Sequence, residues 1–445
     1  MRRLYLSLAL VVLWAVLHAG SGRVLAENWP AWRGDGRGVS PEKNLPLTWS
    51  EGEGVKWKTA IGGAGHSSPI VWDGRVFVTT ASAQDPNVES FRGGVYVGGN
   101  RPKPDASQYA YSVICLDAND GSVLWSKAVV TQSPKTRRHT KNTYASETPA
   151  TDGKCVFASF GPAGLHAVDF NGNVAWHRDL GLIRGRQGWG TGASPVLFRN
   201  TVIVNCDSDY GSYIAAFDKA TGDPVWRTER DESASWGTPL LFPVQDRTVV
   251  VTNGSRRMRG YDAGTGKLLW ECAGGAMFTV PSPVSSEGLV FLSSGHNLLP
   301  PKPIFAIRPE SSGDITPPSG QSRSEGVAWS LRLGGAYVTS PIAVDECLYV
   351  PLDTGLLTCY EARTGKVLYE GQKLGRRNTI TASPAAGDGK IYIQTEDGEC
   401  YVVKAGPQFE ILAVNKLDEV FCASPAISAG KIYLRGRKHL YCIGR

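Results

Sequence analysis

A dipeptide of serine or threonine followed by proline opens a short apolar segment eight times along this chain. Successive repeats are 80, 46, 44, 44, 58, 43 and 41 residues apart, and their prolines are Pro69, Pro149, Pro195, Pro239, Pro283, Pro341, Pro384 and Pro425. A period of roughly 40 to 50 residues is typical of solenoids, propellers and other arrays, in which each unit buries its apolar face against its neighbours. The repeat therefore constrains the fold more than any single residue does.

The fourth repeat shows the secondary structure of one unit. An apolar segment follows Pro239, and three more cover residues 248–252, 258–261 and 267–270, with turn residues between them. Four short strands with regular turns form one blade of a β-propeller. Eight units predict an all-β fold over residues 55–445, an eight-bladed β-propeller of four-stranded antiparallel blades.

The turn between the third and fourth strands has its own pattern, as in Asp218-Lys-Ala-Thr-Gly222 and Asp262-Ala-Gly-Thr-Gly266. The acidic side chain can accept hydrogen bonds from the amides of the turn, and glycine tolerates a positive φ. An aromatic residue follows in six repeats, with Ile411 in the seventh: Trp125, Trp176, Trp226, Trp270, Trp329 and Tyr369. We expect these rings to be structural, because a large side chain at a fixed repeat position fills the wedge between adjacent sheets.

The eighth repeat ends at Arg445 after only three strands, and its fourth strand is predicted at the other end of the chain. Residues 55–61 form an extended segment with Trp57 at the expected aromatic position. Pairing this N-terminal strand with the last one completes the eighth blade. That pairing closes the ring and removes two exposed sheet edges.

These repeats resemble those of the pyrroloquinoline-quinone-like (PQQ-like) propeller family, which includes quinoprotein alcohol dehydrogenases and the propeller lipoprotein of the bacterial outer-membrane assembly machinery. The Asp-x-x-Thr-Gly-x-x-x-Trp pattern carries the resemblance over nearly all of the chain. The segments Asn28–Gly34 and Gly65–Pro69 are similar to those of a secreted bacterial subgroup. The resemblance implies a propeller fold. It does not identify an activity, because one fold hosts many unrelated functions.

The first 26 residues have the pattern of a secretory signal peptide. Arg2 and Arg3 precede an apolar run over residues 8–17, and cleavage is expected near Ala26. The apolar run is short for a membrane span of about 20 residues. The sequence therefore predicts an exported protein, periplasmic or secreted, that does not span a membrane. An N-terminal extension at 27–54 precedes the propeller, which carries insertions at 81–110 and 309–326, the second expected to be flexible.

The formal net charge of the chain bears on which classes of partner it could bind. The formal net charge of +6 falls to +3 when Arg2, Arg3 and Arg23 leave with the signal peptide, so the overall charge does not argue for nucleic acid. A closed ring is self-sufficient as a monomer, although its outer edges could associate.

Nine cysteines in an exported chain suggest disulfides, but their positions in the repeat suggest another role. Cys115, Cys359 and Cys442 align with small residues of the other repeats, namely Ala167, Ala216, Gly260 and Ala306. Free cysteine is often buried as a small apolar residue, so we expect these three to be buried thiols. The absence of a CxxC pattern gives a zinc site little support.

Alternating strands place the second-to-third connections and the links between blades on one face, and most of the unusual residues fall there. Three of these links are basic, and aromatic residues precede several inner strands. The candidate ligand-binding residues are Arg137, Arg138, His139, Tyr144, Arg184, Arg186, Trp189, Trp236, Phe278, Tyr337, Arg376 and Arg377. Guanidinium groups and aromatic rings around an axial opening suit an anionic or planar ligand, although they could also be solvated loops and a plugged channel.

Two functions are consistent with this pattern. The first is a non-catalytic binding or assembly scaffold that uses the basic face to hold a protein or an anionic or planar ligand, with no cofactor and no metal. The second is a PQQ- and Ca²⁺-dependent oxidoreductase, in which the arginines hold the quinone carboxylates. The adjacent cysteine pair that such enzymes often carry is absent. The acidic candidates Glu147, Asp207, Asp209 and Asp353 match no family motif, so we favour the scaffold.

Overall fold

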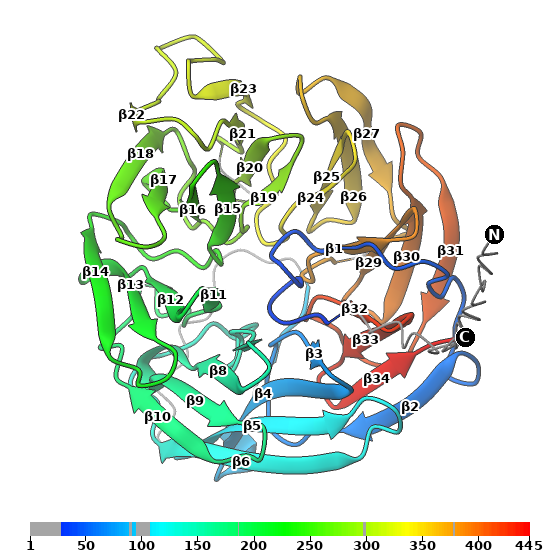
Figure 1. The fold of residues 1–445 in the computed structure, drawn as a ribbon. Coiled ribbons are helices and arrows are strands. Elements are labelled where there is room, and N and C mark those ends of the chain that lie inside the picture. The colour runs from blue at the N-terminus through cyan, green and yellow to red at the C-terminus, as the bar shows by residue number, and fades with distance from the viewer. Residues whose placement is uncertain (1–27, 89–90, 95–106, 186, 297–299, 377–378) are drawn as a thin grey trace, which may run out of the picture.

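The computed structural model describes residues 28–88, 91–94, 107–185, 187–296, 300–376 and 379–445, which form eight β-sheets around a common axis (Figure 1). Each sheet contains one blade of four antiparallel strands, and two of the sheets add a fifth, parallel strand, so the predicted all-β, eight-bladed propeller is confirmed. The expected signal peptide lies outside the described residues. None of the described helices has the length and apolar character needed to cross a bilayer.

The first strand of each blade lies next to the axis and the fourth lies at the perimeter (Figure 1). Blade 1 contains β3 (Ile70–Trp72), β4 (Arg75–Ala83), β5 (Tyr109–Asp117) and β6 (Val123–Gln132). Blade 2 contains β7 (Ala150–Thr151), β8 (Cys155–Ser159), β9 (Leu165–Asp169) and β10 (Val174–Arg178). Blade 3 contains β11 (Val196–Phe198), β12 (Thr201–Cys206), β13 (Ser212–Asp218) and β14 (Pro224–Arg230). Blade 4 contains β15 (Leu240–Val244), β16 (Arg247–Asn253), β17 (Arg257–Asp262) and β18 (Leu268–Ala273).

The second half of the ring repeats this order. Blade 5 contains β19 (Val284–Ser286), β20 (Leu289–Ser293), β21 (Ile304–Ile307) and β23 (Val327–Leu331). Blade 6 contains β24 (Ile342–Val344), β25 (Cys347–Leu352), β26 (Leu356–Glu361) and β27 (Val367–Lys373). Blade 7 contains β28 (Ala385–Gly387), β29 (Lys390–Gln394), β30 (Glu399–Lys404) and β31 (Ile411–Lys416). Blade 8 contains β32 (Ala426–Ser428), β33 (Lys431–Arg435), β34 (His439–Ile443) and β2 (Val55–Ala60).

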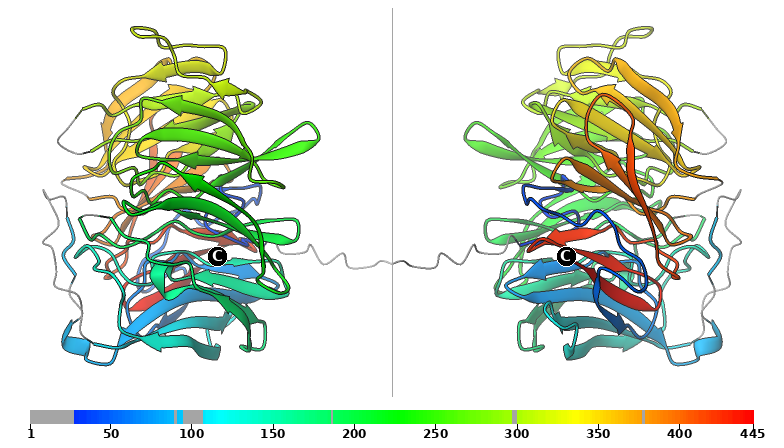
Figure 2. Two further views of the ribbon diagram at one scale, coloured as in Figure 1. Left: turned by 90° about the vertical axis from the view of Figure 1, so that its left-hand side faces the viewer. Right: turned by 90° about the vertical axis from the view of Figure 1, so that its right-hand side faces the viewer.

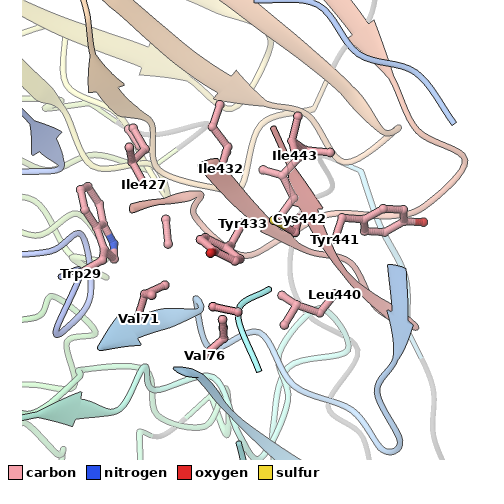
Figure 3. Close-up of a cluster of buried hydrophobic side chains, with 14 of the residues drawn as sticks. Trp29, Val71, Val76, Ile427, Ile432, Tyr433, Leu440, Tyr441, Cys442 and Ile443 are labelled. Carbon is pink, nitrogen blue, oxygen red and sulfur yellow. The ribbon is translucent and has the colours of Figure 1, made fainter. Parts of the chain in front are cut away.

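The N-terminal strand β2 is the outer strand of blade 8, where it pairs antiparallel with β34 and Trp57 lies opposite Cys442. Figure 2 shows the blue and red ends of the chain side by side at this blade. Figure 3 shows the core beneath it, where Tyr433 and Ile443 of blade 8 pack in one buried cluster with Val76 of blade 1.

The first insertion has different bounds from those predicted, and the second contains a strand that was not predicted. Ala81–Ala83 continue β4, and Tyr109 and Ala110 begin β5, so the connection in blade 1 covers residues 84–108 and includes the 3-10 helix η1 (Pro86–Val88). The excursion at 309–326, expected to be flexible, instead adds a fifth strand, β22 (Gly313–Asp314), parallel to β18. Ile315 is buried in the same apolar cluster as Val327. Its burial explains why this excursion is held against blade 4.

In six blades the tryptophan of the fourth strand donates a hydrogen bond to a carbonyl oxygen of the next blade. Trp176 lies opposite Ala167 in blade 2 and donates its indole N–H to the carbonyl of Lys219 in blade 3 over 2.9 Å. A Cβ added to Gly222 of that turn would lie 2.6 Å from the Trp176 ring, and Gly222 has a φ of +74°. The small residue, the tryptophan and the turn glycine of the repeat are thus one interlocking contact.

This arrangement explains the predicted cysteines. Cys115 and Cys359 lie opposite Trp125 and Tyr369, as Cys442 lies opposite Trp57, where only a small side chain fits. All three are buried free thiols, and burial raises the pKa of Cys115 to about 12. They therefore act as small apolar groups, as the repeat predicted.

A closed ring of hydrogen bonds surrounds the axis at the Ser/Thr that precedes each repeat proline. The backbone N–H of each of these residues donates to the side-chain oxygen of its counterpart in the following blade, over 2.8 to 3.1 Å. We call this set the hydroxyl ring; its members are Ser68, Thr148, Ser194, Thr238, Ser282, Ser340, Ser383 and Ser424. The Ser/Thr-Pro repeat therefore joins every blade to the next beside the channel.

The N-terminal extension runs into the centre of the ring (Figure 1). Trp29 forms a bridge with Val71 of blade 1, and β1 (Val39–Ser40) pairs parallel with β28 of blade 7. Arg33 is fully buried and donates to the carbonyl oxygen of Pro341 in blade 6 over 2.9 Å. The extension therefore contacts the innermost strands of several blades, a role that its sequence alone did not predict.

Candidate functional site

A cavity of about 500 Å³ lies on the axis of the propeller. Its wall comes from the links between blades and from second-to-third connections, as the alternation of strands predicted, while Trp32 of the N-terminal extension also lines it. All eight members of the hydroxyl ring line the cavity as well. A cavity of this size is in the range of sites that hold small molecules.

A continuous row of aromatic rings lies at the cavity, and all of its members except Phe278 line it. We call this row the aromatic wall: His139, Trp189, Trp236, Phe278, His296 and Tyr337. The Trp189 ring lies 5.9 Å from Trp236 and 5.0 Å from Phe278, measured between centroids. His296 continues the row at 5.0 Å from Tyr337. Phe278 contacts Trp189 and His296 within the row but is not among the residues that line the cavity.

Another part of the wall carries an ion pair that joins two distant blades. Lys141, in the link before blade 2, pairs with Glu396, which follows β29 of blade 7, and both side chains are largely buried. Glu396 accepts the N–H of Gly94 over 2.7 Å, and Lys141 donates to the carbonyl oxygen of Gly94 over 3.1 Å. The pair thus neutralises its own charges and holds Gly94 of the blade 1 connection at the cavity.

Two imidazoles of the cavity lining are shifted toward their neutral form. Burial lowers the pKa of His66 to about 3, and nearby Arg435 and Arg437 act in the same direction. Burial and Lys141 lower the pKa of His139 to about 4. Both imidazoles are therefore neutral at pH 7.

The carboxyl groups near the cavity respond to burial in the opposite direction. Burial raises the pKa of Asp353, although the backbone amides of Val338 and Tyr337 favour its charged form. Burial also raises the pKa of Glu147 to about 7, against the effect of its hydrogen bond with Thr191. Desolvation thus opposes charge on both carboxyls.

The structure separates the candidate residues named from the sequence into three groups. His139, Trp189, Trp236 and Tyr337 line the cavity together, and Phe278 contacts Trp189 without lining the cavity. Arg138 and Tyr144 do not: Arg138 is buried and donates to the carbonyl of Asn142 over 2.9 Å, and Tyr144 lines a separate small cavity. In the third group, Arg137, Arg184 and Arg376 are exposed and are not among the residues that line the cavity, and Arg186 and Arg377 lie outside the described residues.

Several residues of the cavity were not predicted from the sequence. Trp32 was part of a motif that carried only the family resemblance, and Lys141 lines the cavity while pairing with Glu396, 255 positions away in the chain. Nothing in the repeat pattern signals that pairing. The hydroxyl ring, in contrast, was visible as the residue before each proline, but its side-chain hydrogen bonds were not.

Two of the acidic candidates named from the sequence are held in structural contacts. Asp207 forms a fully buried ion pair with Arg230, 2.8 Å between Oδ1 and Nε. Asp209 accepts the N–H of Ala234 over 3.3 Å. Across the part of the chain that the structure describes, no three His, Cys, Asp or Glu side chains are grouped as a metal ion requires.

Comparison with known proteins agrees with this fold. BamB from Moraxella catarrhalis has a TM-score of 0.52 and 13% identity, over 82% of this chain and 98% of that one. Quinohemoprotein alcohol dehydrogenase from Comamonas testosteroni has a TM-score of 0.60 and 14% identity, over 94% of this chain and 81% of that one. The computationally designed Ika8 protein has a TM-score of 0.57 and 13% identity, over 90% of this chain and 100% of that one. At these identities the likeness concerns the fold alone.

Sequence comparison is more specific than the structural likeness. A search of curated protein sequences finds no match to this chain. A family model described as "Outer membrane protein assembly factor BamB" matches residues 13–205 and 210–300, which is more than half of the chain. The eight-bladed fold, its repeat and this match lead to one conclusion: the chain belongs to the family of the outer membrane protein assembly factor BamB.

Proposed function

We propose that this protein is an exported, non-catalytic scaffold that binds a partner at the face bearing the axial cavity. The observation that carries the proposal is the cavity lining, which combines the aromatic side chains of Trp189 and Tyr337 with the hydroxyl ring. The family description, an assembly factor, supports the same class of function. Export rests on the pattern of residues 1–26, with the periplasm or the exterior as destination.

Photo-crosslinking from single positions tests which face is used. A crosslinking amino acid replaces Arg137 or Arg376, which are exposed on links between blades, in the full-length protein expressed with its own signal. Matched controls carry it at Lys267 or Lys366, exposed in the turns of the opposite face. We expect one discrete adduct from the first pair and none from the second. Equal adducts from both faces, or none from either, would contradict the proposal.

The second candidate function is the PQQ- and Ca²⁺-dependent oxidoreductase, favoured by the axial position and volume of the cavity. The described residues fit that cofactor poorly. Lys141 is the one lysine or arginine among the described residues of the lining, and Glu396 already pairs with it, whereas the cofactor carries three carboxylates. Calcium also needs six to eight oxygen ligands, and Asp353 is the single carboxylate of that lining.

The two candidates differ in one measurement. PQQ with Ca²⁺ is added to the purified protein, and the melting temperature and dye-linked alcohol oxidation are followed. Ligands that bind the folded state raise the midpoint by mass action. The scaffold proposal expects no shift and no oxidation. A saturable rise in midpoint together with alcohol oxidation would replace it with the oxidoreductase.

A further inference from the structure

We infer that the ligand of the axial cavity is a neutral sugar ring, stacked on the aromatic wall at Trp189 and hydrogen-bonded to the hydroxyl ring. This inference deepens the proposed function and rests on it, because it names the chemistry that the scaffold recognises. Three properties of the cavity support it: the orientation of its aromatic rings, the balance of its charges and the hydrogen-bonding capacity of its hydroxyls.

Neighbouring rings of the aromatic wall are tilted with respect to one another, so these pairs form no slot of two parallel faces for a flat ligand. Neighbouring rings of the wall meet at angles between 37° and 87°, the widest being the edge-on contact of His139 with Trp189. A flat aromatic ligand is best held between two parallel faces, and these described pairs offer none. A sugar ring needs one face, because its C–H groups carry a partial positive charge and the indole face carries a partial negative one.

The charges of the wall do not favour an anion. Lys141 is neutralised by Glu396, and burial keeps the imidazoles of His66 and His139 uncharged at neutral pH. Asp353 also lines the cavity and adds a carboxyl group. The exposed arginines of the links lie outside the lining, so they can attract a partner to the face without selecting the group in the cavity.

The hydroxyl ring offers the hydrogen bonds that a polyol needs. Each side-chain oxygen of the ring accepts one backbone N–H, as Ser194 accepts from Thr148 over 2.9 Å. That bond leaves the hydroxyl proton of Ser194 available for donation, and the oxygen keeps a second lone pair. The eight residues are at least 94% buried and line the cavity, so desolvation makes each unmade hydrogen bond costly. Sugar hydroxyls, which donate and accept, match this set.

The experiment titrates the purified full-length protein with glucose, N-acetylglucosamine, maltose and chitobiose, and follows tryptophan fluorescence and saturation-transfer NMR. Glucuronic acid is the anionic arm and quinoline-2-carboxylate the planar arm. We expect at least one neutral sugar to bind saturably, and to bind more tightly than both other arms. Binding of a planar or anionic probe in preference to every neutral sugar would overturn the inference, as would saturable binding of no sugar.

Variants locate the binding. Trp189→Ala should weaken the affinity for the sugar about tenfold, and Trp189→Phe should recover most of the loss. Tyr210→Ala is the matched control, because Tyr210 is 59% exposed and is not part of the lining. Unchanged melting temperatures exclude unfolding as the cause. An equal loss for Tyr210→Ala, or no loss for Trp189→Ala, would contradict the assignment to this cavity.

The two proposals fail in different ways. Crosslinking from Arg137 and Arg376 without sugar binding would leave the scaffold in place and remove only the sugar. Absence of both would remove the scaffold as well. Sugar binding that survives Trp189→Ala would place the sugar elsewhere on the protein.

Discussion

The backbone N–H of Ser424 donates to the hydroxyl oxygen of Ser68 over 3.0 Å, although 356 positions separate the two residues in the chain. This bond is the last of the eight in the hydroxyl ring, and it joins blade 8 to the residue that opens blade 1. The pairing of β2 with β34 joins the two ends of the chain again at the perimeter. The ring is therefore closed both beside the axis and at its outer edge.

Replacing Ser68 by alanine should destabilise the protein by about 1–3 kcal/mol, because the buried N–H of Ser424 would lose its acceptor. Chemical denaturation measures the change. Ser68→Thr should retain most of the stability, since threonine occupies the same position of the ring at Thr148 and Thr238. Ser126→Ala, on the exposed surface of β6, serves as the control. Equal effects of the changes at Ser68 and Ser126 would refute the role of the ring.

Gly222→Ala should cost more stability than Gly74→Ala, although both glycines have a φ of +74°. A left-handed alanine costs roughly 1–2 kcal/mol at either site. At Gly222 the new Cβ would also lie 2.6 Å from the ring of Trp176, whereas no atom lies within 4 Å of the position at Gly74. The difference between the two unfolding free energies isolates the contact between blades. Equal losses would show that the tryptophan yields without cost.

Lys141→Met should destabilise the protein by about 3–5 kcal/mol, because it leaves the carboxylate of Glu396 buried without its cation. The double variant Lys141→Met, Glu396→Gln should recover at least half of that loss, since it removes the stranded charge. Denaturation at low and high salt measures both variants. A double variant no more stable than Lys141→Met would show that the loss has another origin.

The stability of the protein should depend on pH through Glu147. Burial raises its pKa from 4.5 in the unfolded chain to about 7 in the folded protein, so the folded state binds more protons between these values. Stability from this group is then fully present below about pH 4.5 and falls as the pH rises through 7, by up to about 3 kcal/mol. Glu147→Gln should remove this dependence.

The measurement compares wild type and Glu147→Gln by denaturation between pH 4 and 8. The variant should gain stability relative to wild type as the pH rises. His66 gives the opposite trend, because its lowered pKa costs stability as the pH falls from 6.5 toward 3, but it contributes equally to both proteins. A pH-independent difference would contradict the assignment to Glu147.

Residues with local or periodic signals were predictable from the sequence. The spacing of the prolines indicated eight blades, and the alignment of Cys115 and Cys359 with alanines indicated a small site opposite an aromatic ring. Trp57 indicated which segment matched the missing strand. Short strands and tight turns are set by neighbouring residues, and the repetition of one unit shows how the units pack.

The composition of the cavity was decided by the tertiary structure. The basic links suggested an anionic site. Arg138, however, is buried and donates a hydrogen bond to the carbonyl oxygen of Asn142, and Lys141 forms an ion pair with Glu396 of blade 7. Trp32 reaches the cavity because the N-terminal extension enters the channel. Sequence thus determined the blades, whose contacts recur at a fixed period. Folding alone determined the charge of the cavity, because that charge depends on loops that no repeat relates to one another.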